Sequence, residues 1–174
     1  MSGIDQKNDS KLLGQVLAFV GLLAFSMAEN GLGYFPSLYG SVPKLSFTML
    51  FVLCFYHPAI MPLISVFLVG VVHDLSQANP IGYTSALMVM AHCWIMFRRP
   101  MLMQTESGSI WYEFTIMMLA MMLFMLTVIV AFTGNLPALQ PLLFQFSLTV
   151  LMFPMMNWMY HLIMGFAAIL EQVR

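Results

Sequence analysis

The sequence predicts an all-helical protein that crosses a membrane six times. Apolar residues make up 61% of the 174 residues and charged residues only 7%, whereas ordinary soluble domains hold about 25% charged residues. A helix needs roughly 20 mainly apolar residues to cross a hydrocarbon core about 30 Å thick. The chain therefore has material for five or six crossings, in a single integral membrane domain over residues 1–174.

The count of six depends on how residues 45–72 are divided. This apolar stretch is interrupted by His57-Pro58 and by Pro62. Proline cannot donate to the helix ladder and disfavours helix in the residue before it, so His57-Pro58 predicts a turn between two short spans. We expect these two spans to be tilted, or the first to extend backwards to the region of Pro43. The six expected spans are residues 12–28, 40–57, 59–73, 81–97, 111–132 and 142–169.

The distribution of lysine and arginine favours the same count. With six spans, the basic residues on the side of the N-terminus are Lys7, Lys11, Arg98, Arg99 and Arg174, and only Lys44 lies opposite. With five spans, the Arg98-Arg99 pair moves to the outside. Because short cytoplasmic loops are enriched in lysine and arginine, both termini are expected in the cytoplasm. The net charge of -1 gives no reason to expect nucleic-acid binding.

Polar residues and proline set the expected ends of the spans. Glu29 and Asn30 end the first span, and the glycine- and proline-rich residues 31–43 predict an irregular segment at the membrane interface. Ser26-Met27-Ala28 is similar to a signal-peptide cleavage site, but we expect a retained first span. Arg98-Arg99-Pro100 is expected to stop the fourth span.

No residue pattern predicts an enzyme. Asp74 is a functional candidate because an ionisable group at membrane depth is costly, but its place at a span end favours a cap or turn residue. The adjacent His73 is expected to point in another direction. We see no His pair on one helix face and no arrangement of serine, histidine and acid, so the chain is expected to have no catalytic residue, no cofactor and no metal.

Methionine is in excess, with 19 copies. Met117, Met121 and Met125 recur every fourth residue, which places them in one stripe of the fifth span. Methionine is flexible and apolar, so the stripe predicts packing against irregular helix surfaces. Two further hypotheses are a docking face for a partner's transmembrane helix and, because soft thioethers bind Cu(I), a copper path.

A set of spaced residues in the second to fourth spans carries a family resemblance. The set comprises Pro43, Phe55-Tyr56, Pro58, Phe67, Gly70, Asp74 and Gly82, followed by Ala86-Leu87. In this spacing the chain resembles the bacterial rod shape-determining protein MreD family. The matched region, residues 43–98, covers about a third of the chain, and it has Phe-Tyr-His-Pro where many relatives carry a tryptophan near the proline.

The resemblance implies a non-enzymatic scaffold of the cell-elongation (rod) complex in the bacterial inner membrane, supporting rod shape and the organisation of peptidoglycan synthesis. The implied partners are an MreC-type periplasmic scaffold and, in the wider complex, MreB, RodZ and the peptidoglycan synthases of elongation. Members of the family also resemble, in fold, the substrate-binding subunits of energy-coupling-factor transporters.

That likeness of fold supplies an alternative function, a substrate-binding membrane subunit of a vitamin or small-molecule transporter. The outer polar residues available to such a site are Tyr34, Tyr39, Asp74, Gln77, Asn79, Asn135 and Gln140. Under the scaffold hypothesis the important surfaces are helix faces. Gly70 lies on the same helical face as Asp74 and would let another backbone approach closely, so we expect Gly70→Leu to harm assembly more than Asp74→Asn.

Overall fold

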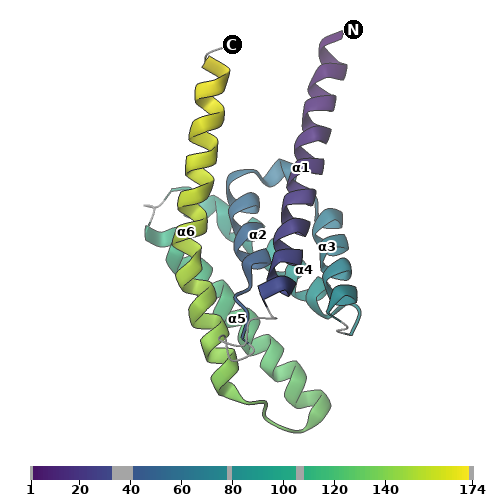
Figure 1. Cartoon of the computed structure of the whole chain (residues 1–174), viewed down its shortest axis with the longest axis vertical. Coiled ribbons are helices and arrows are strands. Elements are labelled where there is room, and N and C mark those ends of the chain that lie inside the picture. Colours follow the sequence, from purple (N-terminus) through teal and green to yellow (C-terminus); the bar gives the residue numbers. More distant parts are fainter. Residues whose placement is uncertain (1, 33–40, 78–79, 105–107, 173–174) are drawn as a thin grey trace.

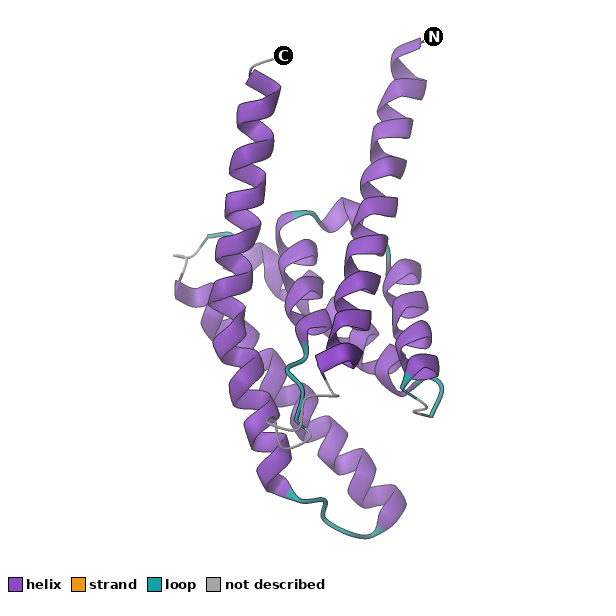
Figure 2. Cartoon of the chain, in the orientation of Figure 1, coloured by secondary structure: helices purple, strands orange, loops and turns teal. Residues whose placement is uncertain are grey.

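The computed structural model describes residues 2–32, 41–77, 80–104 and 108–172, with side chains for 12–32, 41–77, 80–104 and 110–162. The described residues are helical apart from short connections and contain no strand, which confirms the all-α class (Figures 1 and 2). The helices are α1 (Ser2–Leu32), α2 (Leu45–Tyr56), the short 3₁₀-helix η2 (Pro58–Ile60), α3 (Leu63–Ser76), α4 (Tyr83–Leu102), α5 (Gly108–Thr133) and α6 (Leu139–Gln172).

Consecutive α-helices run in alternating directions along the long axis of the molecule (Figure 1). Helices α1 to α4 form a body, and α5 and α6 form a long hairpin against it. The first turns of α1 and the last turns of α6 project from the same end of the molecule. We call the opposite end of the body the cap end; there α1 and α3 finish and α2 and α4 begin.

Aromatic rings join the hairpin to the body. The ring of Phe51 in α2 meets Phe114 of α5 and Phe153 of α6 edge-on, with both pairs of centroids 5.4 Å apart. Phe114 and Phe153 stack on each other at 4.3 Å. All three side chains are buried, and such aromatic pairs contribute about 0.5–1.5 kcal/mol beyond the area they bury. This cluster therefore fixes both helices of the hairpin to α2.

The predicted break at His57-Pro58 is confirmed, because α2 ends at Tyr56 and α3 begins at Leu63. The two helices have 12 and 14 residues, or about 18 and 21 Å at 1.5 Å per residue. Within the described ranges, three helical segments are long and apolar enough to cross a membrane: Leu12–Leu32, Ile110–Thr133 and Leu139–Leu162. Six crossings would need α2, α3 and α4 as well, so the number six stays a prediction.

Several helices extend about a turn beyond the predicted span ends. Helix α1 continues past Glu29 to Leu32, because the Glu29 carboxylate is paired within the chain. Helix α3 continues past residue 73 to Ser76. Helix α4 passes through Pro100 to Leu102, although Pro100 cannot donate a hydrogen bond to the carbonyl four residues before it. Of the expected interfacial segment, residues 33–40 lie outside the described residues, and 41–44 are irregular.

The methionine stripe on α5 lies mainly inside the chain. Met117 has no exposed surface and Met121 is only 5% exposed, because their face of α5 packs on the body. The hypothesis that these two residues dock a partner's helix is therefore wrong. Met125 is half-buried and lines a cavity between the hairpin and the body.

Candidate functional site: a buried polar cluster at the cap end

Polar side chains gather inside the cap end, where four helix termini meet. They come from the end of α1, the segment before α2, the first turn of α2 and the last turns of α3. The members are Ser26, Glu29, Lys44, Ser46, His73 and Asp74; all except Lys44 are buried. An ionisable group at this depth is costly unless it is paired, so the partners of each one decide what the cluster does.

Glu29 is fully buried and holds the start of α2 to the end of α1. Its Oε2 accepts hydrogen bonds from the backbone N–H of Ser46, at 3.3 Å, and from the Ser46 hydroxyl, at 2.7 Å. The ammonium of Lys44 lies 2.7 Å from Oε1. The carboxylate thus satisfies a free N–H in the first turn of α2, where the helix dipole favours negative charge, and Lys44 supplies the matching cation.

His73 brings a serine and an acid together, which contradicts the expectation that no such arrangement exists. Its Nδ1 lies 2.6 Å from the Ser26 hydroxyl, and its Nε2 lies 4.0 Å from Oε1 of Glu29. The distance to Glu29 exceeds that of a hydrogen bond. All three side chains are fully buried, so no substrate reaches the serine in this structure. The group links α1 to α3.

Asp74 caps the start of α4, as its position at a span end indicated. Its oxygens accept hydrogen bonds from the backbone N–H groups of Gly82 and Thr84, both at 2.9 Å, and from the Ser85 hydroxyl at 3.5 Å. Gly82 has φ = 98°, a left-handed conformation that glycine adopts without steric cost. His73 and Asp74 therefore point to different neighbours, as expected for adjacent helical residues.

Gly70 allows α3 and α4 to touch along their backbones. A Cβ atom built on Gly70 would lie 2.4 Å from the Cα of Ser85 and 2.9 Å from its backbone nitrogen. The close approach predicted for this face is therefore present, and the approaching backbone belongs to α4 of the same chain. Gly70, Asp74 and Gly82 form one corner that sets the α3–α4 geometry; we call it the α3–α4 corner.

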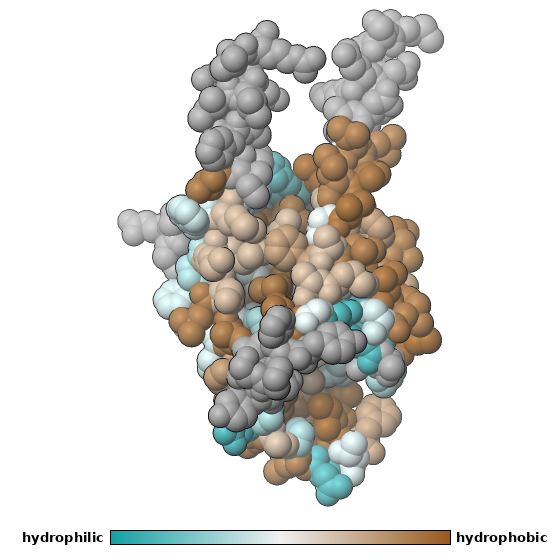
Figure 3. Space-filling model, in the orientation of Figure 1, coloured by the Kyte–Doolittle hydropathy of each residue, from teal (hydrophilic) through white to brown (hydrophobic). Residues whose placement is uncertain are grey.

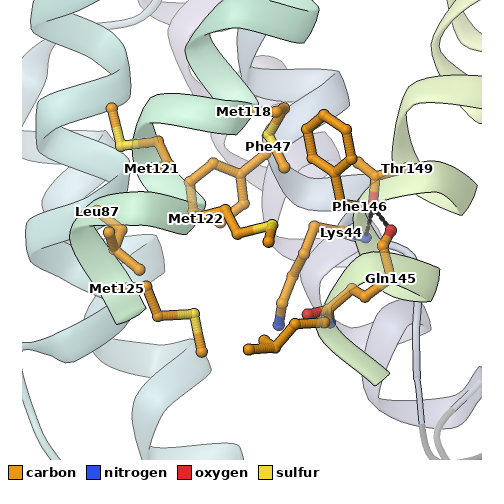
Figure 4. Close-up of a pocket in the computed structure, with 11 residues that line it drawn as sticks. Lys44, Phe47, Leu87, Met118, Met121, Met122, Met125, Gln145, Phe146 and Thr149 are labelled. Atoms are coloured by element: carbon orange, nitrogen blue, oxygen red, sulfur yellow. Dashed lines mark hydrogen bonds between the residues drawn. The ribbon is translucent and has the colours of Figure 1, made fainter. Parts of the chain in front are cut away.

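The segment 41–44 joins the cap end to α6. The backbone N–H of Lys44 donates to the Thr149 hydroxyl at 3.0 Å, and the Gln145 side-chain amide donates to the carbonyl of Val42 at 2.8 Å. Figure 4 shows Lys44, Gln145 and Thr149 together on one side of a cavity. The same lysine that pairs with Glu29 thus also positions the hairpin.

The cavity beside Lys44 is small and mainly apolar. Its volume is about 60 Å³, whereas pockets for drug-sized ligands measure about 300–1,000 Å³. Four methionines of α5 line it, and Figure 4 shows them spread along the wall. These are Met118, Met121, Met122 and Met125, facing Phe47, Leu87, Leu142 and Phe146. The lining fits packing of the hairpin against the body.

A second buried carboxylate, that of Glu113, pairs with an arginine near the C-terminal end of α4. Glu113 of α5 is 3% exposed and accepts hydrogen bonds from Arg98 Nε at 2.8 Å, Arg98 Nη2 at 3.0 Å and Trp94 Nε1 at 3.0 Å. Arg99 Nε donates to the carbonyl of Phe55, near the end of α2, at 2.8 Å. The two arginines that indicated orientation in the sequence therefore also tie α4 to its neighbours.

The other three histidines take part in separate packing contacts. His57 Nε2 lies 2.7 Å from the Tyr160 hydroxyl, and His161 Nε2 lies 3.0 Å from the Tyr56 hydroxyl. His92 Nε2 donates to the carbonyl of Met61 at 3.1 Å. Among the residues with described positions, no three His, Cys, Asp or Glu side chains are grouped to hold a metal ion.

The remaining residues of the resemblance serve the framework in different ways. Pro43 is buried before α2, and Pro58 begins η2. Phe67 is 47% exposed on the outer face of α3. Of the polar residues proposed for a ligand, Tyr34, Tyr39 and Asn79 lie outside the described residues. The Asp74 carboxylate already accepts hydrogen bonds at the start of α4, and the Gln77 side chain donates to Asn30.

Sequence reasoning missed Ser26, Glu29 and Lys44 as members of one cluster. It treated them as parts of span ends, although Glu29 and Lys44 are the two charged residues that flank the turn between the first two spans. Opposite charges on either side of one turn between antiparallel helices are the signal that identifies them. Comparisons of this chain with protein families, curated proteins and solved structures gave no match.

Proposed function

We propose that this chain is a non-catalytic membrane scaffold of the bacterial cell-elongation complex. In this proposal it crosses the inner membrane six times with both termini in the cytoplasm. The specific assignment rests on the resemblance of residues 43–98 to the MreD family. The partners proposed are an MreC-type scaffold, with MreB, RodZ and the peptidoglycan synthases of elongation in the wider complex.

The non-catalytic part of the proposal rests on the partners of the buried carboxylates, which are groups of the same chain. Glu29, Asp74 and Glu113 accept hydrogen bonds from helix N-termini or pair with cations of the same chain. Acids in intramembrane enzymes and transporters face a substrate or ion path. Here the acids instead fix where helices begin and how they pack, which is the requirement of a framework.

The proposed scaffold meets its surroundings through apolar helix faces. The outer surfaces of α1, α3, α5 and α6 expose large hydrophobic side chains (Figure 3). Membrane helices associate through van der Waals packing and a few polar contacts, so such faces are available to lipid and to partner helices. The residues of the α3–α4 corner then act indirectly, by giving these faces a fixed shape.

A vitamin-binding subunit is the alternative, and the present partners of two of its candidate ligand groups weigh against it. Its candidate ligand groups Asp74 and Gln77 already bind groups of this chain. Cavity size does not weigh against it, because Gln140 lines a hollow of about 380 Å³, which is within the usual range for small-ligand sites.

The proposal is tested by depletion and by purification from native cells. Loss of the chain should turn rod-shaped cells round, and a tagged chain extracted in mild detergent should bring with it a coiled-coil periplasmic scaffold and elongation synthases, identified by mass spectrometry. The variant Gly21→Ala, at a site where an added Cβ makes only an ordinary contact with Met49, is the control for tagging and expression. Recovery of transporter ATPase subunits, or of a bound vitamin, would contradict the proposal.

A further inference from the structure

Helix α3 is short and faces outward. It has 14 residues, about 21 Å in length, which is roughly 9 Å less than the thickness of a typical hydrocarbon core. Its outer side chains are exposed, with Ile64 at 73%, Phe67 at 47% and Leu75 at 62%. Figure 3 shows hydrophobic residues over the side of the molecule where α3 lies in Figure 1.

The ends of α3 are fixed, so the helix has no means of lengthening. At its start Pro62 is the residue before the first turn, and the preceding Met61 carbonyl is held by His92. At its end Asp74 is bound to α4, and the Ser76 hydroxyl accepts a hydrogen bond from Asn30 at 2.6 Å. Polar groups therefore lie directly beyond the cap end of the apolar stretch.

Tilt does not remove the mismatch. A helix longer than the membrane fits by tilting, but tilting a short helix reduces the thickness it spans still further. On the hairpin side the apolar segment Ile110–Thr133 has 24 residues, about 36 Å, and it adapts by tilt. The α3 side and the hairpin side of the molecule therefore match bilayers of different thickness.

The chemistry of the α3 face favours lipid over another protein helix. Its exposed members between the helix ends are large and apolar: Leu63, Ile64, Phe67, Leu68 and Leu75. Close packing of membrane helices uses small residues, and the glycine of α3, Gly70, faces Ser85 of α4. A shallow apolar groove along Pro62, Leu63, Ile64, Phe67 and Val89 offers a surface that suits an acyl chain.

We propose that the α3 face binds a thinned patch of bilayer and selects lipids with short acyl chains, while the hairpin side contacts bilayer of ordinary thickness. This inference rests on membrane insertion as stated in the proposed function, but not on a role in the rod complex. The α3 side of the protein would then lie in locally thinner membrane than the hairpin side.

Tryptophan quenching by brominated lipids tests the inference. Phe67→Trp reports on α3 and Phe124→Trp on α5; the native side chains are similarly exposed, at 47% and 43%. Both are made in a background with Trp94, Trp111 and Trp158 changed to Phe, and Ile64→Trp is a second reporter on α3. Circular dichroism of each reconstituted variant confirms that its helix content matches the parent. Phosphatidylcholines with 14- and 22-carbon chains then compete with a brominated 18-carbon lipid.

At position 67 we expect the 14-carbon lipid to compete about threefold or more better than the 22-carbon lipid, with no such preference at position 124. Equal competition at both positions, or a preference for long chains at 67, would overturn the thinning proposal alone. Weak quenching at 67 and 64 with strong quenching at 124 would also overturn it, because a second copy would then cover α3. Weak quenching at every position would contradict membrane insertion and the proposed function with it.

Discussion

Replacing Gly70 by alanine adds one methyl group at the closest contact between α3 and α4. The new Cβ would lie 2.4 Å from the Cα of Ser85, 2.9 Å from its nitrogen and 2.9 Å from its hydroxyl oxygen. Two of these three atoms are backbone, so rotation of a side chain does not relieve the overlap. To reach the 3.4 Å at which ordinary contacts begin, the two backbones must separate by about 1 Å in a closely packed interior.

The cost follows from the overlap and from helix propensity. Forcing extra methyl groups into a packed core typically costs about 1–3 kcal/mol, whereas alanine in place of glycine within a helix contributes about 0.5–1 kcal/mol in the favourable direction. We therefore expect Gly70→Ala to lower the free energy of unfolding by about 1–2 kcal/mol. Because the main overlap is with backbone, adding Ser85→Gly should restore little of that loss.

The assay is unfolding of the purified protein by sodium dodecyl sulfate in mixed micelles, followed by circular dichroism. Gly21→Ala is the matched control, since the nearest atom to its added Cβ is the methyl carbon of Met49 at 3.9 Å. That variant should be as stable as the parent or up to about 1 kcal/mol more stable. The reasoning is refuted if Gly70→Ala matches Gly21→Ala, or if Ser85→Gly fully restores stability.

Substitutions at two further positions test the cap end by the same sodium dodecyl sulfate unfolding experiment. Asp74→Ala removes the cap of α4 and should lower the free energy of unfolding by about 0.5–2 kcal/mol, whereas Asp74→Asn keeps one acceptor oxygen and should cost less; no loss in Asp74→Ala would show that the carboxylate is not the cap. Lys44→Met leaves the buried Glu29 carboxylate without its cation and should cost up to roughly 3 kcal/mol. Adding Glu29→Gln to Lys44→Met should recover part of this loss, and a further loss in the double variant would contradict the pairing.

Helix positions were predictable because they depend on local rules. Continuous apolar runs and the His57-Pro58 interruption predicted six helices in the right order. Most of their ends were wrong by about a turn, and the start of α1 was wrong by ten residues. The errors arose where a tertiary contact compensates a locally unfavourable residue. Glu29 remains inside α1 because Lys44 and Ser46 neutralise and bind it, and no rule applied to residues 12–32 alone contains that information.

The candidate site was predictable only in part. Asp74 as a cap and Gly70 as a point of close approach follow from residue type and position on a helix. Their partners in α4 follow from the short connection between the antiparallel helices α3 and α4. The partnership of Ser26, Glu29 and His73 depends on how α1 packs against α3, across more than forty residues of sequence for Ser26 and His73. For the methionine stripe, the spacing predicted that the residues share one face of α5, but it did not predict whether that face is buried in the chain or exposed.

The central claim is that the short helices α2 and α3 both cross the membrane, so that the chain crosses six times. Labelling single cysteines in intact cells with a membrane-impermeant maleimide tests it most directly, in a background with Cys54 and Cys93 changed to alanine. Gln77 and Met103 are both exposed and lie beyond opposite ends of α4. Six crossings predict that Gln77→Cys is labelled from outside and that Met103→Cys is labelled only after the cells are opened. The reverse pattern would fit five crossings, or six crossings with both termini outside, and would contradict this account.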